Sequence, residues 1–208
     1  MGRQPSRLVA GQGVPVIDLF AGAGGLGLGL GAAGADVRLS VDLDKVSCET
    51  LRLNPRHHHG VVLEGDVHQL RGGDLRALAG LTRTEPLVLV GGAPCQPFSK
   101  AAYWTDPGDD AAFRRARARG LEAQRPSPIL QARPDNRRSL VGQFLRLVSE
   151  TQAEAFIFEN VPSITHPRNR QVLDNLIAEA TELGFRVEWF KANAADYGVP
   201  QLRERVFV

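Results

Sequence analysis

The sequence predicts an α/β protein in which a doubly wound, mostly parallel sheet carries helices on both faces. Short apolar runs alternate along the chain with stretches of helical apolar spacing, and a glycine-rich turn follows the first run. Residues 87–90 are nearly pure Leu and Val, which is typical of a strand buried on both faces. Strands that alternate with helices form βαβ units, and these units build a parallel sheet.

Each element follows from its local pattern. The expected strands are Val14–Phe20, Asp36–Val41, Val61–Glu64, Leu87–Val90, Phe156–Phe158, Phe185–Phe190 and Val206–Val208. The expected helices are Gly24–Gly34 after the glycine-rich turn, Lys45–Leu53 before Pro55, Leu140–Gln152 and Gln171–Leu183 before Gly184. Residues 103–139 contain four prolines and few bulky apolar side chains, so we expect a long loop with one short helix near Ala111–Gly120.

Length and composition favour one ordinary globular domain over residues 1–208. Apolar residues make up 43% of the 208 positions and charged residues 23%, which excludes wholesale disorder. No apolar run approaches the roughly 18 residues that a membrane helix needs, and the first residues lack a secretory signal, so we expect a cytoplasmic protein, nucleoid-associated if prokaryotic. Cys48 and Cys95 are each interpreted as a lone thiol, and no metal site is expected.

The net charge of +2 is small, but cationic residues gather in the long loop. Eight arginines lie between Ala111 and Arg138 against two acidic residues, among them Arg114, Arg115, Arg117 and Arg119. Such a segment is suited to phosphate contacts, or it is a solvated surface insertion.

The carboxyl ends of the first two expected strands carry residues suited to a nucleotide-like ligand. Ligands bind at these ends in a doubly wound sheet. Glycines in the turn Asp18–Gly25 let the backbone approach a ligand, although the pattern also fits a simple tight turn. Asp42 ends the second strand where a carboxylate would bind ribose hydroxyls, with Asp44 as the local competitor. These features favour an adenosine-containing cofactor and leave its identity open.

The turns after the later strands carry reactive groups. Cys95 lies between Pro94 and Pro97 in Gly91–Ser99, directly after the fourth expected strand, which favours an exposed nucleophile over a buried inert thiol. Glu159 directly follows the fifth expected strand. Because Cys95 follows the neighbouring strand, Glu159 is a candidate general acid in the same site. The alternation Gln201-x-Arg203-x-Arg205 places two arginines on one strand face, where they can clamp a carboxylate, a phosphate or a base.

The ordered set DLFAGAGG, GGAPCQPFS, FENVPS and QLRERVFV resembles the cytosine-5 DNA methyltransferase family. The resemblance runs from near the N-terminus to the last residue and implies a Rossmann-like class I methyltransferase fold with S-adenosylmethionine as cofactor. It implies that Asp42 binds the ribose and that Asp66 lies near the adenine amino group. The remaining cofactor-binding residues that it implies are Phe20, Gly22, Gly24, Leu43, Pro94 and Leu140.

The resemblance also implies a mechanism. Cys95 adds to carbon 6 of cytosine so that carbon 5 becomes nucleophilic enough to take the methyl group. Glu159 holds or protonates ring nitrogen 3, and Asn160 supports the loop. Arg203 and Arg205 fix the base carbonyl and Glu159. The cytosine is flipped out of the duplex, and the loop after Cys95 is the expected lid.

The DNA contacts implied by the resemblance are Gln96 and Ser99, and the four arginines near Ala111–Gly120 are suited to the phosphate backbone. Family members continue after the Arg-x-Arg strand into a target-recognition region and a closing helix. We therefore expect that the target-recognition domain is absent from these 208 residues. A second polypeptide is then expected to supply both parts, or else the chain is a piece of a longer protein.

Three other functions remain open at this point. The tRNA cytosine-5 methyltransferases share the chemistry of Cys95 and Glu159. A non-catalytic paralogue that binds DNA or a partner is disfavoured because such a binder has no need of a thiol at Cys95. A nicotinamide-dependent dehydrogenase is the remote alternative, distinguished by which cofactor stabilises the fold.

Overall fold

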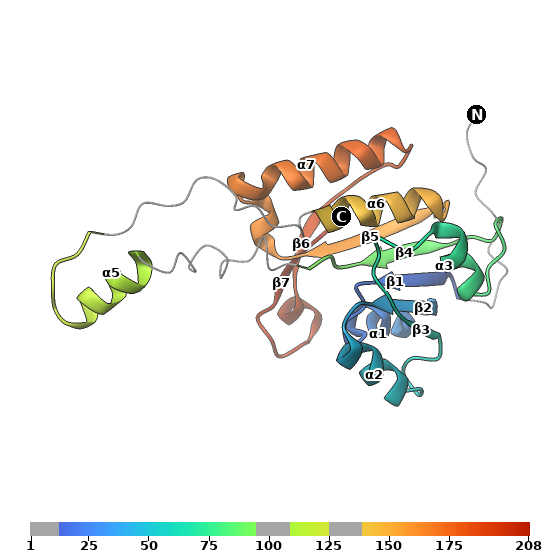
Figure 1. The fold of residues 1–208 in the computed structure, drawn as a ribbon, viewed down its shortest axis with the longest axis horizontal. Coiled ribbons are helices and arrows are strands. Elements are labelled where there is room, and N and C mark those ends of the chain that lie inside the picture. The colour runs from blue at the N-terminus through green and yellow to red at the C-terminus, as the bar shows by residue number, and fades with distance from the viewer. Residues whose placement is uncertain (1–12, 95–108, 125–138) are drawn as a thin grey trace.

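A computed structural model describes residues 13–94, 109–124 and 139–208 (Figure 1). Its strands are β1 (Pro15–Leu19), β2 (Asp36–Asp42), β3 (Val61–Glu64), β4 (Val88–Gly91), β5 (Ala155–Asn160), β6 (Phe190–Asn193) and β7 (Glu204–Phe207). Its helices are α1 (Gly25–Ala32), α2 (Lys45–Leu53), α3 (Gly72–Leu78), α5 (Asp109–Ala118), α6 (Leu140–Glu150) and α7 (Pro167–Glu182), with short 3-10 turns η2 (Pro162–Thr165) and η3 (Ala194–Tyr197).

The strands form one seven-stranded sheet in the order β3-β2-β1-β4-β5-β7-β6. The strands β1 to β5 pair in parallel, and β7 runs antiparallel to both β5 and β6. The prediction of a doubly wound, mostly parallel sheet is therefore confirmed. The chain moves outward from β1 to β3 and then continues on the other side of β1 with β4, which creates a switch point between β1 and β4. Ligands bind at the carboxyl ends of strands beside such a point.

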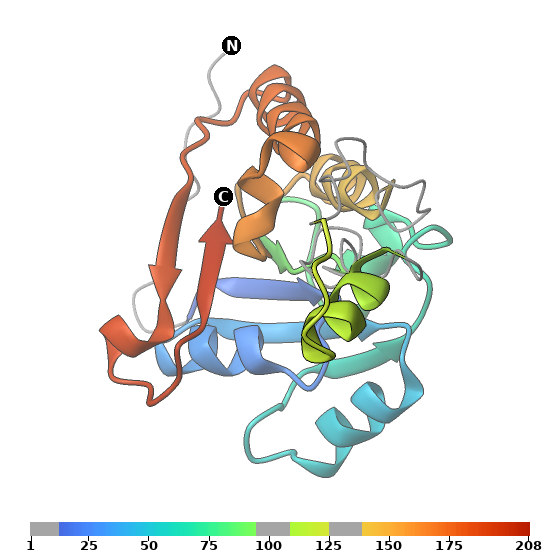
Figure 2. The ribbon, with the colours of Figure 1, turned by 90° about the vertical axis from the view of Figure 1, so that its left-hand side faces the viewer.

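Helices cover both faces of the sheet. Figures 1 and 2 show α6 and α7 on one face and α1 and α2 on the other. The core on the α6 face is apolar and includes Leu19 of β1, Val41 of β2 and Phe158 of β5. The ring of Phe144 in α6 lies 5.3 Å from that of Phe158, centroid to centroid, and is fully buried. This packing fixes α6, whose first residue, Leu140, reaches the carboxyl edge of the sheet.

One predicted strand, Phe185–Phe190, is wrong in extent. Residues 185–189 have no strand partner, and β6 begins only at Phe190. Phe185 and Val187 instead pack against the core, and Phe185 meets Phe156 edge to face with centroids 5.1 Å apart. The apolar alternation there reflects side-chain burial and not a hydrogen-bonded ladder.

The other boundaries differ by a few residues, and α3 is an element that the sequence analysis did not predict. Helix α7 begins at Pro167, four residues before the predicted start at Gln171. Proline is well suited to the first helical position because its missing N–H has no partner there in any case. Helix α5 matches the short helix expected near Ala111–Gly120, and Figure 1 shows it apart from the two helical layers. The described helices are all too short or too polar to cross a bilayer.

Candidate active site

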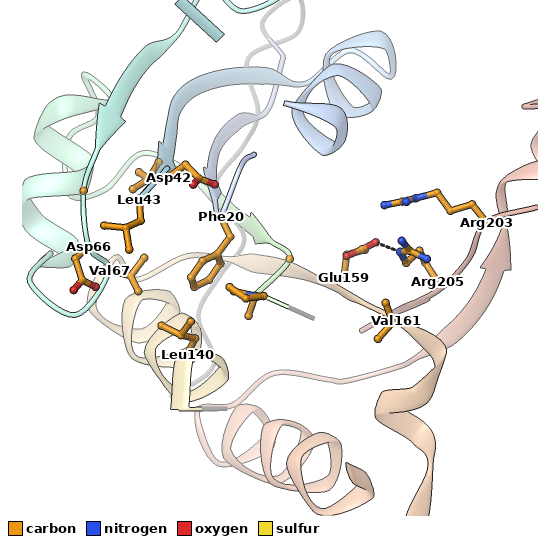
Figure 3. A pocket seen from close by; sticks show the side chains of 15 residues that line it. Phe20, Asp42, Leu43, Asp66, Val67, Leu140, Glu159, Val161, Arg203 and Arg205 are labelled. Atoms are coloured by element: carbon orange, nitrogen blue, oxygen red, sulfur yellow. Dashed lines mark ion pairs between the residues drawn. The ribbon is translucent and has the colours of Figure 1, made fainter. Parts of the chain in front are cut away.

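A cavity of about 300 Å³ opens at the carboxyl edge of the sheet, where the turns after β1 to β5 converge (Figure 3). It is lined by Phe20, Val41, Asp42, Leu43, Gly65, Asp66, Val67, Gly92, Ala93, Pro94, Leu140, Glu159, Val161, Arg203 and Arg205. One side holds apolar side chains between two carboxylates, and the other side holds an acid and two arginines. The cavity thus combines an apolar end with a charged end.

Asp42 is held in place at the end of β2 by two backbone amides. Its Oδ2 accepts a hydrogen bond from the amide of Gly22 at 2.7 Å, and Oδ1 accepts one from the amide of Asp44 at 2.8 Å. Asp44 has another task, because its Oδ2 caps α2 by accepting from the amide and hydroxyl of Ser47. These bonds from Ser47 lower the pKa of Asp44. Of the two competing carboxylates, only Asp42 lines the cavity.

The turn after β1 brings Phe20 into the cavity through an unusual backbone conformation. Phe20 has φ of 57°, in the left-handed region that non-glycine residues seldom adopt. The amide of Ala21 donates to the carbonyl of Val41 at 3.0 Å and secures the turn to β2. Gly22 and Gly24, both predicted to bind the cofactor, are not among the lining residues. Gly24 instead permits close packing, because a Cβ there would overlap the side chain of His58.

Asp66 lies in the turn after β3, at the apolar end of the cavity. Its Oδ1 accepts from the amide of His68 at 2.9 Å and lies 2.8 Å from Nδ1 of the same residue. The backbone bond from His68, followed by the side-chain bond, lowers the pKa of Asp66. An ionised side chain therefore lies beside the apolar side chain of Val67 at this end of the cavity (Figure 3).

An ion pair between Glu159 and Arg205 forms the charged end. Glu159 lies on β5 and Arg205 on the adjacent antiparallel strand β7, with 2.7 Å between Oε1 and Nε. Both side chains are about one fifth exposed, so the pair is only partly screened by solvent. The Glu159 carboxylate fits here because position 92 is glycine, where a Cβ would lie 2.9 Å from Oε2. Arg203, just before β7, lines the same end.

Asn160 acts beside the cavity and not in it. It is 1% exposed, and its Nδ2 donates to the carbonyl of Ala93 at 3.1 Å while Oδ1 accepts from the amide of Val161 at 2.9 Å. The two bonds fasten the end of β5 to the segment that ends at Pro94. Asn160 therefore supports the backbone that leads to Cys95.

Asp18 is a buried carboxyl group without a hydrogen-bond partner among the described residues. It lies on β1, is 1% exposed, and neither carboxylate oxygen has a partner of ordinary geometry. Burial raises the pKa of Asp18 from 3.8 to about 7; the nearby amide of Gly27 lowers the pKa, and the charge of Asp42 raises it further. In the sequence, Asp18 stands out only as the first residue of the glycine-rich turn.

The remaining predicted site residues are of two kinds. Cys95, Gln96 and Ser99 fall outside the described residues, while their neighbour Pro94 lines the cavity. Of the four arginines predicted to bind DNA, Arg114, Arg115 and Arg117 are on α5 and Arg119 follows the helix directly; none of them lines the cavity. The lining residues that the sequence analysis missed include Val67, next to Asp66, and Gly92, in the double glycine before Pro94. Their adjacency to predicted residues was the available signal.

The fold and the cavity together define a class of protein. A doubly wound sheet with a carboxylate at the end of β2 and a ligand-sized cavity at its switch point is an α/β protein of the cofactor-binding type. The profile of the C-5 cytosine-specific DNA methylases matches residues 14–208, and the chain belongs to this family. Methyltransferase families in general take the methyl group from S-adenosylmethionine.

Known relatives agree with this membership. The chain is 33% identical over 207 residues to the type II methyltransferase M.SacI of Streptomyces achromogenes, covering 94% of this chain and 47% of that protein. It is 35% identical to M.XorII of Xanthomonas oryzae over 92% of this chain and 39% of that protein. It is 32% identical to M.AquIA of Picosynechococcus over 93% of this chain and 70% of that protein. The chain thus spans less than half of M.SacI and M.XorII.

Solved structures show the same fold. A protein described as a DNA modification methyltransferase encoded within an E. coli prophage superposes with a TM-score of 0.67 at 28% identity, over 93% of this chain and 45% of the other. A DNMT2 variant from Spodoptera frugiperda superposes with a TM-score of 0.53 at 16% identity, over 93% of this chain and 48% of the other. The second likeness concerns the fold alone.

Proposed function

We propose that the chain is the catalytic part of a DNA (cytosine-5-)-methyltransferase that transfers methyl from S-adenosylmethionine to carbon 5 of a flipped-out cytosine. One observation carries the proposal. A single cavity is lined both by the residues suited to the cofactor, such as Phe20 and Asp42, and by those suited to the base, Glu159 and Arg205. Pro94, which also lines it, directly precedes Cys95 in the sequence.

The residues at the apolar end fit the cofactor. A carboxylate accepts about four hydrogen bonds, so Asp42 retains acceptor positions for ribose hydroxyls beyond its two backbone partners. Asp66 has the acceptor chemistry that an adenine amino group requires, and Phe20, Leu43 and Leu140 supply apolar surface for the purine. When bound, S-adenosylmethionine supplies a methyl group activated by its sulfonium charge.

The charged end fits activation of the base. Carbon 5 of cytosine is a poor nucleophile until the thiolate of Cys95 forms a bond to carbon 6, which pushes electrons toward ring nitrogen 3. Glu159 would hold the proton at that nitrogen, and Arg205 orients Glu159 through their 2.7 Å ion pair. Arg203 would bind the base carbonyl. After transfer, loss of the carbon-5 proton expels the Cys95 thiolate and restores the aromatic ring.

Target recognition is proposed to come from outside these 208 residues. Residues 1–208 would form one catalytic domain, and a second polypeptide would supply the recognition domain and a closing helix. The chain covers less than half of M.SacI and M.XorII, so much of each relative has no counterpart in these 208 residues. Tritiated methyl transfer measured with and without the added polypeptide tests it, and full sequence-specific turnover by the 208 residues alone would contradict it.

The proposed substrate is tested by offering both polymers. With tritiated S-adenosylmethionine, we expect label in DNA as 5-methylcytosine and none in tRNA. Label in tRNA alone would favour the tRNA cytosine-5 methyltransferases, and cofactor binding without any transfer would favour a non-catalytic paralogue. The type II names of the relatives support a role in restriction-modification, which predicts methylation of one short DNA sequence.

Asp42→Ala should weaken S-adenosylmethionine binding by about 1–3 kcal/mol, roughly 5- to 150-fold in Kd, because ribose hydroxyls lose a charged acceptor. Titration calorimetry gives the difference. Asp44→Ala is the matched control: it removes the cap of α2, so it should lower thermal stability and leave affinity within about twofold. The reverse pattern would assign the ribose contact to Asp44.

Helix α5, together with Arg119 directly after it, is proposed to contact the DNA backbone. Replacing Arg114, Arg115, Arg117 and Arg119 with Gln should weaken binding to all DNA sequences alike and reduce the salt slope by up to about 0.9 log unit per lost phosphate contact. Fluorescence anisotropy at several salt concentrations measures both effects. The exposed Arg186→Gln variant serves as the control. Loss of binding to one sequence only would show that α5 reads bases.

A further inference from the structure

The guanidinium of Arg146 joins two walls of the cavity. Arg146 lies on α6, and its side chain reaches the turn after β3, where it donates to the carbonyls of Val67 at 2.7 Å and Leu70 at 3.0 Å. On its own helix it donates to Oε1 of Gln143 at 2.8 Å and to Oε1 of Glu150 at 2.7 Å. Arg146 thus connects α6 to the turn through two main-chain carbonyls.

Glu150 provides a second connection from α6, to the start of α3, the helix that follows the same turn. Its Oε2 accepts from the amide of Gly72, at the start of α3, at 2.9 Å. The bonds from Arg146 and from the Gly72 amide, in that order, lower the pKa of Glu150, so it remains ionised and paired. Position 72 must be glycine for this approach, because a Cβ there would overlap the backbone of Glu150.

Helix α6 and the turn after β3 carry the cavity residues on opposite sides of the apolar end. Leu140 lies six residues before Arg146 on α6, while Gly65, Asp66 and Val67 belong to the turn whose carbonyls Arg146 holds. Figure 3 shows Leu140 on one side of this end and Val67 with Asp66 on the other. The hydrogen bonds of Arg146 to Val67 and Leu70 therefore bridge the segments that carry the two sides.

We infer that Arg146 is a positioning residue that sets the width of the adenine end of the cavity and the placement of Asp66; this rests on the proposed function. Arginine is suited to the task because its planar fork carries five donors in fixed directions and serves four acceptors at once. A lysine retains the charge at a single point and cannot reproduce that geometry. Arg146 itself does not line the cavity.

The test measures recognition of the purine separately from stability. We compare the Kd of S-adenosylhomocysteine with that of S-inosylhomocysteine, in which a carbonyl replaces the adenine amino group, by calorimetry on the full 208-residue chain. The wild type should prefer the adenosyl ligand because the Asp66 carboxylate accepts from the amino group and repels the carbonyl. Arg146→Lys should reduce that preference by about tenfold.

Arg170→Lys is the matched control, since Arg170 forms an i,i+4 pair with Asp174 on α7 and does not line the cavity. It should retain the wild-type preference. If Arg146→Lys does not fold, Glu150→Gln replaces it, because this amide still accepts from Gly72 while losing the charged bond to Arg146; a smaller change in the same direction is expected. An unchanged preference in the folded variant overturns the inference. Failure of the wild type to bind either ligand overturns the proposed function instead.

Discussion

Cys95→Ser should abolish methyl transfer to DNA, by about 10³-fold or more, while S-adenosylmethionine still binds with nearly wild-type affinity. A serine hydroxyl ionises far less readily than a thiol, so addition to carbon 6 fails although the cavity keeps its shape. Tritium transfer, with any required partner present, measures the first quantity, and calorimetry measures the second.

The covalent step has an independent signature. DNA that carries 5-fluorocytosine should form an adduct with the wild-type protein that survives denaturation, since fluorine cannot leave as the carbon-5 proton does. Cys95→Ser should form none, whereas Cys48→Ser, which alters a fully buried thiol on α2, should still form it. Full turnover by Cys95→Ser would end the assignment of Cys95 as the nucleophile.

Asp18→Asn should make the protein more stable than the wild type as the pH rises from 4 to 8. The pKa of Asp18 is about 7 in the folded protein and near 3.8 in the unfolded chain. Between these values the unfolded chain has released a proton that the folded protein keeps, so raising the pH favours unfolding. The stability lost by the wild type across this window is about 4 kcal/mol.

Denaturant unfolding at several pH values measures this difference. The gap between Asp18→Asn and wild type should widen steadily up to pH 7 and then level off, and Asp18→Leu, which also lacks the charge, should give the same slope. If the free energy of unfolding of both variants changes with pH in the same way as that of the wild type, folding does not raise the pKa of Asp18. The test uses the slope of the free energy of unfolding against pH, because the effect of each substitution on local packing does not change with pH.

The fold was predictable where the sequence pattern fits only one kind of secondary structure. The strands β1, β3, β4 and β5 are short, mainly apolar runs, while β2 alternates polar with apolar residues, and their pairing in a doubly wound sheet follows from the alternation with helices. The region of Phe185 and Val187 was not predictable, because the same alternation describes side chains packed on a core and a hydrogen-bonded strand. Helix α3 was missed because it is short and begins with Gly72 and Gly73, which are poor helix formers.

The site was predictable as far as it depends on strand ends. Asp42, Asp66, Glu159 and the two arginines lie at or next to strand ends, where the topology brings ligand-binding groups together, and all of them line one cavity. The sequence could not predict that Asp42 lines the cavity while Asp44 caps α2, since this depends on which backbone amides donate to each carboxylate. The link from Arg146 to Val67 spans 79 residues, and neither local pattern nor spacing indicates it.

Helix α1 has a consequence for the motions of the protein. Glycine occupies alternate positions at 25, 27, 29 and 31, each costing up to about 1 kcal/mol of helix stability relative to alanine, and only Gly27 is buried. Where Gly29 and Gly31 stand, a Cβ would meet open space, so packing does not compensate. The amides of α1 should exchange with deuterium long before those of α6, at an opening free energy far below that of global unfolding. A ligand bound beside the Phe20 turn can therefore order α1, which follows that turn, more than it can order α6.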